Sequence, residues 1–115
     1  MERRIPLAAG SARAVVDLEA GCRLASLEVG GREVLVTAGT GPSEWGAYPM
    51  APFAGRVRDG RFAFAGNSYE LPRTLGGHAI HGTVYLRPWE PEGEDGFVTA
   101  LGPDWPFPGW ARQVI

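Results

Sequence analysis

Residues 13–37 read RAVVDLEAGCRLASLEVGGREVLVT, and this stretch decides the fold class. Apolar and polar side chains alternate through residues 13–19 and again through residues 23–29. Alternation with a period of two is typical of β-strands that have one buried face. Gly30-Gly31 favours a two-residue hairpin turn, so a further strand is expected at residues 32–37.

Short alternating segments continue along the rest of the chain, separated by many of its 17 glycines and 10 prolines. The pairs Asp59-Gly60 and Gly66-Asn67 predict turns, and the acidic run 90–95 predicts a solvated turn. No segment shows helical spacing, so the chain is predicted to be all-β, an antiparallel sandwich or barrel. Beyond residue 56 the expected strands are 57–58, 61–65, 69–71, 85–89, 97–101 and 111–115.

Residues 38–55 interrupt this pattern with a long segment rich in glycine and proline. Trp45, Tyr48, Met50 and Phe53 are distributed through it, and such side chains argue against disorder. Long loops in small domains are often functional, so this loop is a candidate for part of a binding site.

Length and charge narrow the function classes. With 115 residues the chain is at most one domain, and a net charge of −2 gives no reason to expect a nucleic-acid partner. Cys22 is the single cysteine, so it cannot form an internal disulfide or a multi-cysteine zinc site. We interpret it as a structural thiol.

Apolar runs are short throughout. The stretch 5–9 is too short for the core of a signal peptide, and no window approaches the roughly eighteen apolar residues of a membrane span. We therefore expect a soluble, cytoplasmic protein without a membrane partner.

The two histidines, His78 and His81, lie in a glycine-flanked segment, residues 76–82. In an extended segment, positions three apart point to opposite faces, so the two rings are expected to do different jobs. No third ligand at a suitable spacing accompanies them, so neither a metal site nor a cofactor is expected. Gly82 directly after His81 allows a ligand or another backbone to approach closely.

Arginines follow the aromatic loop. Arg56 lies between that loop and an apolar residue, whereas Arg58 and Arg61 flank the predicted turn and are expected to be exposed on a solvated hairpin. A guanidinium donates several hydrogen bonds in a fixed fork, and aromatic rings cover the apolar C–H faces of sugars. The candidate rings, most of which are expected in the core, are those of Trp45, Phe53, Trp89, Trp105, Phe107 and Trp110.

Four motifs in the same order resemble the aldose 1-epimerase (galactose mutarotase) family. A Pro-aromatic stretch leads into Gly55-Arg56 within residues 49–62, and Gly66, Tyr69, Leu71 and Pro72 follow. Residues 78–82, HAIHG, resemble the first-histidine motif of the family, and residues 105–109, WPFPG, resemble its aromatic-proline turn. The similarity extends over essentially the whole chain.

The resemblance implies that residues 1–115 are the N-terminal portion of one mutarotase-like β-sandwich domain. It implies an isomerase that interconverts the α and β anomers of a free aldose such as glucose or galactose. Gly55, Arg56 and His81 would bind the sugar, with His81 also assisting catalysis. The main acid, a second histidine, and the main base, a late glutamate, would lie beyond Ile115. Many members carry Asn before the arginine, where this chain has Gly55.

Three other interpretations compete with this one. A non-enzymatic carbohydrate-binding β-sandwich module shares the arginine and aromatic features. A sugar-phosphate epimerase would need further basic residues for the phosphate, to which Arg58 could contribute. The third is a structural or interaction domain without a fixed ligand.

Overall fold

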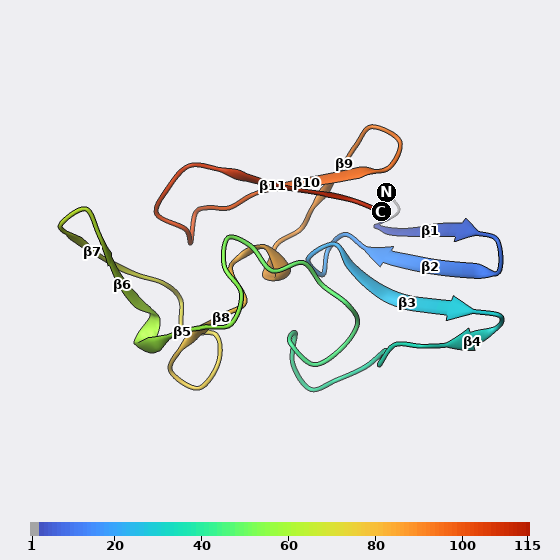
Figure 1. The fold of residues 1–115 in the computed structure, drawn as a ribbon, viewed down its shortest axis with the longest axis horizontal. Coiled ribbons are helices and arrows are strands. Elements are labelled where there is room, and N and C mark those ends of the chain that lie inside the picture. Colours follow the sequence, from blue (N-terminus) through green and yellow to red (C-terminus); the bar gives the residue numbers. More distant parts are fainter. Residues whose placement is uncertain (1–2) are drawn as a thin grey trace.

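The computed structural model describes residues 3–115 and consists of antiparallel sheets joined by loops (Figure 1). Four strands pair in chain order, namely β1 (Arg4–Ala9), β2 (Ala12–Asp17), β3 (Arg23–Val29) and β4 (Arg32–Glu33). A three-stranded sheet has the order β11-β10-β9 and contains β9 (Glu90–Glu92), β10 (Gly96–Ala100) and β11 (Trp110–Val114). The all-β, antiparallel sandwich prediction is confirmed.

Two short pairs lie between these sheets in the sequence. One joins β5 (Arg56–Val57) to β8 (Ala79–Ile80), and the other joins β6 (Arg61–Phe64) to β7 (Asn67–Glu70). Within residues 3–115 the helical segments are two single 3-10 turns, η1 (Arg58–Gly60) and η2 (Val84–Leu86). In this described part of the chain, no helix has the length and apolar character needed to cross a membrane. The expectation about a signal peptide also concerns Met1 and Glu2, which lie outside the described residues.

The strand β1 was not predicted from the sequence. It pairs with β2 in a register that sets Ile5 against Val16 and Leu7 against Ala14. Pro6 lies within it, and proline is tolerated because β1 is the edge strand of its sheet. The alternating run is short, and a proline occupies one of its outward positions, so the pattern is weak in the sequence.

The predicted strand 32–37 is wrong in extent, because β4 ends at Glu33. The Glu33 carboxylate accepts hydrogen bonds from the Leu27 and Leu35 backbone N–H groups, at 2.9 Å and 3.2 Å, and from the Ser26 hydroxyl. The Glu33 side chain thus binds backbone N–H groups that would otherwise be available to a regular ladder. Val36, beyond the end of β4, is 67% exposed.

Three further expectations need correction. A turn does form at Asp59-Gly60, but β5 pairs with β8 and not with β6, so the arginines there do not sit on one hairpin. The β6–β7 turn is Ala65-Gly66, one residue earlier than predicted. Residues 85–89 form no strand, because η2 turns the chain into the core and the strand begins only at Glu90.

The core joins both sheets. Val16 and Leu18 from the β2 segment, Val84 of η2, Trp89 and Phe97 of β10 form one buried cluster that also includes Cys22. The Trp89 indole N–H donates to the Val84 carbonyl at 2.9 Å, and the Trp89 backbone N–H donates to the Leu18 carbonyl at 2.9 Å. The connection from η2 to β9 is thereby fixed against the end of β2.

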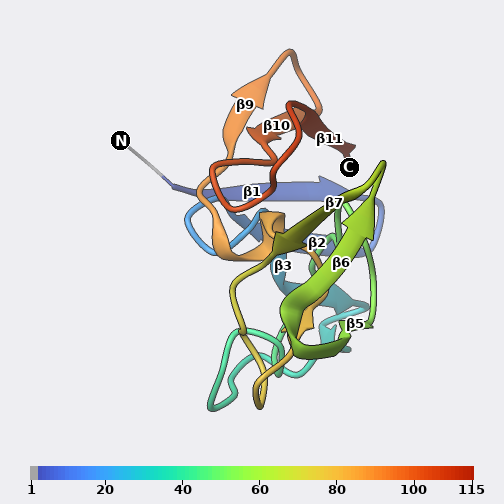
Figure 2. The ribbon, with the colours of Figure 1, turned by 90° about the vertical axis from the view of Figure 1, so that its left-hand side faces the viewer.

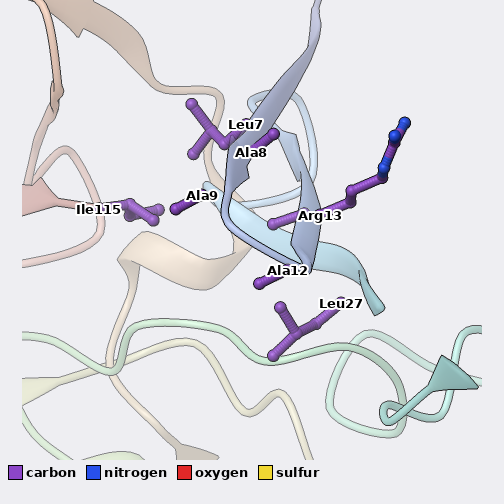
Figure 3. A pocket seen from close by; sticks show the side chains of 8 residues that line it. Leu7, Ala8, Ala9, Ala12, Arg13, Leu27 and Ile115 are labelled. Carbon is purple, nitrogen blue, oxygen red and sulfur yellow. The ribbon is translucent and has the colours of Figure 1, made fainter. Parts of the chain in front are cut away.

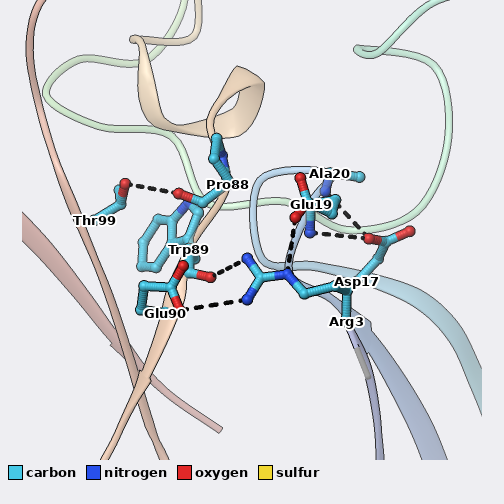
Figure 4. A network of polar contacts seen from close by, with 8 residues as sticks. All are labelled: Arg3, Asp17, Glu19, Ala20, Pro88, Trp89, Glu90 and Thr99. Carbon is cyan, nitrogen blue, oxygen red and sulfur yellow. Dashed lines mark hydrogen bonds and ion pairs between the residues drawn. The ribbon is translucent and has the colours of Figure 1, made fainter. Parts of the chain in front are cut away.

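Near the surface, hydrogen bonds and ion pairs join the same segments (Figure 4). The Arg3 guanidinium lies between Glu19, Glu90 and Trp89, donating to the two carboxylates and, at 2.7 Å, to the Trp89 carbonyl. The Asp17 carboxylate accepts the backbone N–H groups of residues 19 and 20. One arginine therefore attaches the first strand to the start of β9.

The molecule is elongated, with extents of 52 × 30 × 22 Å, and the β6–β7 hairpin projects from one end (Figures 1 and 2). Its radius of gyration is 15.6 Å, compared with about 13 Å for a compact chain of similar length. The two outer strands of the three-stranded sheet differ in character. In β9, Glu90, Pro91 and Glu92 are all exposed, whereas in β11 Trp110 is 73% and Val114 56% exposed.

Cys22 is a fully buried thiol, which confirms its structural interpretation. Gln113 of β11 donates from its side-chain amide to the Cys22 carbonyl at 3.0 Å and to Sγ at 3.3 Å. Burial raises the pKa of the thiol from 9.0 to about 11, although the hydrogen bond from Gln113 acts in the opposite direction. The folded state therefore resists ionisation of this group.

This shift predicts an alkaline loss of stability. The unfolded chain releases the thiol proton near pH 9.0 and the folded chain only near pH 11, so the free energy of unfolding falls as pH rises through this interval. Below pH 9.0 the contribution is complete. Urea midpoints measured from pH 8 to pH 11 should fall more steeply for the wild type than for Cys22→Ala. Parallel pH profiles would show that this thiol does not couple to folding.

Candidate functional site

The short strands β5 and β8 bring the three predicted site residues to neighbouring positions. Arg56 pairs with Ile80, and the backbone N–H of His81 donates to the Gly55 carbonyl at 2.9 Å. Gly55 and His81 are 26 residues apart in the sequence, yet they form adjacent positions of one ladder with Arg56.

The side chain of Arg56 is exposed, and it lies opposite Ile80, which is buried. In a regular antiparallel ladder, neighbouring positions point to opposite faces. His81 departs from that rule because its φ is +61°, in the left-handed region. Convergence of the Arg56 and His81 side chains on one ligand stays a prediction.

The His81 ring is held by the backbone. The Gly55 N–H donates to its Nδ1 at 3.2 Å, and the side chain is half-buried. The protein thus engages Nδ1 of the imidazole. Nε2 is the ring nitrogen that remains available for a further hydrogen bond.

Gly82 provides the close approach that the sequence predicts. Its φ is +81°, and a Cβ added there would lie 2.0 Å from the Ala51 carbonyl oxygen. The same oxygen accepts the Thr83 N–H at 2.8 Å, and Ala51 forms a parallel bridge with Gly82. The approaching group is therefore backbone from the 38–55 loop, and this contact positions that loop beside His81.

Two tyrosine rings flank His81. The centroid of the Tyr48 ring lies 6.0 Å and that of Tyr85 6.4 Å from the imidazole centroid, and the two tyrosines stack on each other at 5.3 Å. The Tyr48 hydroxyl donates to the Ser43 carbonyl at 2.9 Å, and burial raises the pKa of this tyrosine. The stacked pair of tyrosine rings therefore lies beside the imidazole.

The Arg23 guanidinium packs against the Tyr48 ring and the neighbouring Trp45 ring. It is only 1% exposed, and its guanidinium carbon lies 4.3 Å from the Trp45 ring centroid and 4.7 Å from that of Tyr48. It donates to the carbonyls of Ala20, at 2.9 Å, and Trp45, at 2.7 Å. Burial lowers the pKa of the guanidinium, but an arginine remains charged at neutral pH.

Sequence reasoning missed Arg23 and Tyr85 as parts of this region, whereas Tyr48 lies in the 38–55 loop that was predicted to contribute to a binding site. The available signal is the phase of Arg23, which shares the inward-facing positions of its strand with Ala25. A charged residue in the buried phase of a strand needs hydrogen-bond partners and is more informative than an exposed one.

His78 contacts a different segment from His81. Its Nδ1 accepts the Asp59 backbone N–H at 3.0 Å, and its own backbone forms a bridge with Leu75. The two rings therefore bond different segments, and the expectation that they do different jobs stays a prediction. Within residues 3–115 no group of three or more His, Cys, Asp or Glu side chains gathers in a way that could hold a metal ion.

The expectation that most of the candidate aromatic residues lie in the core is wrong. Among them Trp89 alone is fully buried, and Trp110 is 73% exposed. Trp105 lies 6.1 Å from Phe53 and stacks on Phe62 at 5.5 Å, between ring centroids. A half-exposed aromatic cluster therefore links the 38–55 loop, the β6–β7 hairpin and the 101–109 loop.

A separate cavity of about 280 Å³ lies at the far end of the four-stranded sheet (Figure 3). Leu7, Leu27, Ile115 and alanines of β1 and β2 line it, while the Arg13 guanidinium points away from it. A sugar site requires several convergent polar groups, and this lining supplies none. The β5–β8 region remains the candidate site.

Comparison with solved structures places the fold. The chain is 22% identical to a putative aldose 1-epimerase from Escherichia coli K12, with a TM-score of 0.66 over 84% of this chain and 35% of that one. It is 17% identical to a galactose mutarotase-like protein from Clostridium acetobutylicum, with a TM-score of 0.70 over 95% and 40%. For galactose 1-epimerase from Lactobacillus acidophilus the values are 21%, 0.62, 95% and 39%.

These likenesses define a galactose mutarotase-like β-sandwich, and the chain spans between 35% and 40% of the length of those proteins. The aldose 1-epimerase family model matches residues 3–107. The chain therefore belongs to the aldose 1-epimerase family, as the sequence motifs suggest. A comparison with curated protein sequences finds no match.

The contact at Gly82 predicts a large difference between two glycine substitutions. Gly82→Ala and Gly77→Ala both place a side chain at positive φ, but only position 82 has backbone within the space of a Cβ. We expect Gly77→Ala to destabilise by about 1 kcal/mol and Gly82→Ala by at least about 2 kcal/mol more. Urea unfolding monitored by tryptophan fluorescence measures both. Equal losses would mean that the Ala51 contact does not constrain the fold.

Proposed function

We propose that this chain carries the sugar-binding Arg56 and His81 of an enzyme that interconverts the α and β anomers of a free aldose. Family membership supports the reaction class. The observation that carries the residue assignment is the ladder that sets Gly55, Arg56 and His81 together, beside two stacked tyrosines.

Anomer exchange opens and recloses the pyranose ring. A base removes the proton of the C1 hydroxyl while an acid protonates the ring oxygen, so that the bond between C1 and the ring oxygen breaks and a C1 carbonyl forms. Rotation about C1–C2 and the reverse proton transfers give the other anomer. Two proton-transfer groups on opposite sides of the sugar are required.

The proposal gives Arg56 and His81 distinct roles. The exposed guanidinium of Arg56 can donate to sugar hydroxyls in a fork. His81 binds the sugar and helps to polarise the ring oxygen, because its ring retains one nitrogen for the ligand. The glutamates of residues 3–115 lie in no matching motif, so the main base and the main acid belong to the part of the fold that this chain does not match.

Polarimetry of fresh α-glucose and α-galactose tests the reaction. We expect the complete gene product to accelerate anomer exchange, and residues 1–115 alone to leave the buffer rate unchanged, because the two main proton-transfer groups are missing. Exchange catalysed by the 115 residues alone would refute the assignment of those groups. Sugar binding by the complete protein without exchange would support a carbohydrate-binding module instead.

Substitutions in the complete protein test the two residues. Arg56→Met and His81→Gln should each lower kcat/KM for anomer exchange by about 10-fold to 100-fold, the range expected when one or two hydrogen bonds involving a charged or polarised group are lost. Arg58→Met is the matched control, since Arg58 lies on the exposed η1 turn, and it should leave the rate unchanged. Equal effects of the two arginine substitutions would exclude a specific role for Arg56.

A further inference from the structure

The His81 imidazole replaces a backbone carbonyl in the ladder. Gly55 and His81 occupy a hydrogen-bonded position, because the His81 N–H donates to the Gly55 carbonyl at 2.9 Å. In a regular antiparallel pair the Gly55 N–H would donate in return to the His81 carbonyl. Here it donates to His81 Nδ1 at 3.2 Å.

The backbone of His81 explains this exchange. With φ at +61° the chain leaves the extended conformation at His81, so that its carbonyl turns out of the ladder. The side chain then lies against the position that the carbonyl vacates. Histidine is one of the residues that adopt the left-handed conformation more readily than most.

The hydrogen bond determines which ring nitrogen carries the proton. A backbone N–H can only donate, so Nδ1 must be the unprotonated acceptor, and in a neutral imidazole the proton then resides on Nε2. We propose that the Gly55 N–H holds His81 as the Nε2–H tautomer, so that His81 presents a hydrogen-bond donor to its ligand, with Gly55 as the positioning residue.

This inference specifies the chemistry of the ligand atom that faces His81. A ring in this state donates at Nε2 and cannot remove a proton there, so its partner is an oxygen with a free lone pair, such as the ring oxygen or a hydroxyl oxygen of a sugar. The identity of that partner rests on the proposed function, whereas the tautomer rests on the protein alone.

The same geometry explains the residue at position 55. Gly55 has a φ of +76°, and a Cβ there would meet no atom within 4 Å, so the constraint is the backbone conformation and not space. Glycine and asparagine are the residues that best tolerate this region. An asparagine at position 55 can thus hold the same backbone, and the amide of residue 55 acts through its main chain.

Nuclear magnetic resonance of the complete protein labelled with ¹⁵N tests the proposal. Across a hydrogen bond, a scalar coupling joins the donor nitrogen to the acceptor nitrogen. We expect a coupling between the Gly55 amide nitrogen and His81 Nδ1, and a proton attached to His81 Nε2. His81→Gln identifies the ring signals, and the Asp59–His78 hydrogen bond of 3.0 Å provides a second coupling as an internal control.

Two substitutions separate backbone conformation from bulk. Gly55→Val disfavours positive φ and should abolish the coupling to His81, while the Asp59–His78 coupling in the same sample persists. Gly55→Asn should retain both couplings. If Gly55→Val does not fold, the wild-type spectrum decides: a proton on Nδ1, or no coupling from Gly55, overturns the proposal. Retention of the His81 coupling in folded Gly55→Val also overturns it.

Addition of galactose or glucose distinguishes this inference from the proposed function. A shift of the His81 Nε2 signal on addition of either sugar supports both. An Nε2–H ring that neither sugar perturbs upholds the tautomer and overturns the proposed function. An Nδ1–H ring in a protein that exchanges anomers overturns the tautomer and upholds the function.

Discussion

The contact between Gly82 and the Ala51 carbonyl is the constraint on which the arrangement of the site region depends. It joins the long 38–55 loop to the segment that carries His81, and the Thr83 N–H donates to the same carbonyl. The Thr83 hydroxyl extends the connection by donating to the Leu101 carbonyl at 2.8 Å. Near the middle of the loop, Leu24 and Ala47 exchange two backbone hydrogen bonds. Together with the His81 N–H bond to the Gly55 carbonyl, these main-chain contacts fix a loop without regular structure at residues 47, 51 and 55.

Strands with a regular alternation of apolar and polar residues could be predicted from the sequence. Residues 23–29, 97–101 and 111–115 correspond closely to β3, β10 and β11. The strand β1 was missed because Pro6 interrupts a short apolar pattern, and β9 because acidic residues on a sheet edge resemble a solvated turn. The strand pairing of β5 with β8 depends on contacts between distant segments, which periodicity does not report.

The site shows the same division between local and distant information. Gly55, Arg56 and His81 stand out by their motifs, and the structure places them on one ladder. The positive φ of His81 and the contacts of Arg23 with the Trp45 and Tyr48 rings could not be predicted, because each depends on the packing of the 38–55 loop. A motif identifies residue types, whereas orientation arises from the tertiary contacts that surround them.

The two outer strands of the three-stranded sheet differ in how well their side chains discourage pairing with another strand. Prolines and charged residues on an outer strand discourage pairing with another chain, and β9 carries Pro91 between two exposed glutamates. The β11 edge carries one charged residue, Arg112, which pairs with Glu92 at 2.8 Å, between the exposed apolar side chains of Trp110 and Val114. Of the two outer strands of this sheet, β11 is therefore less protected against pairing with another strand, such as one from a second copy of the chain.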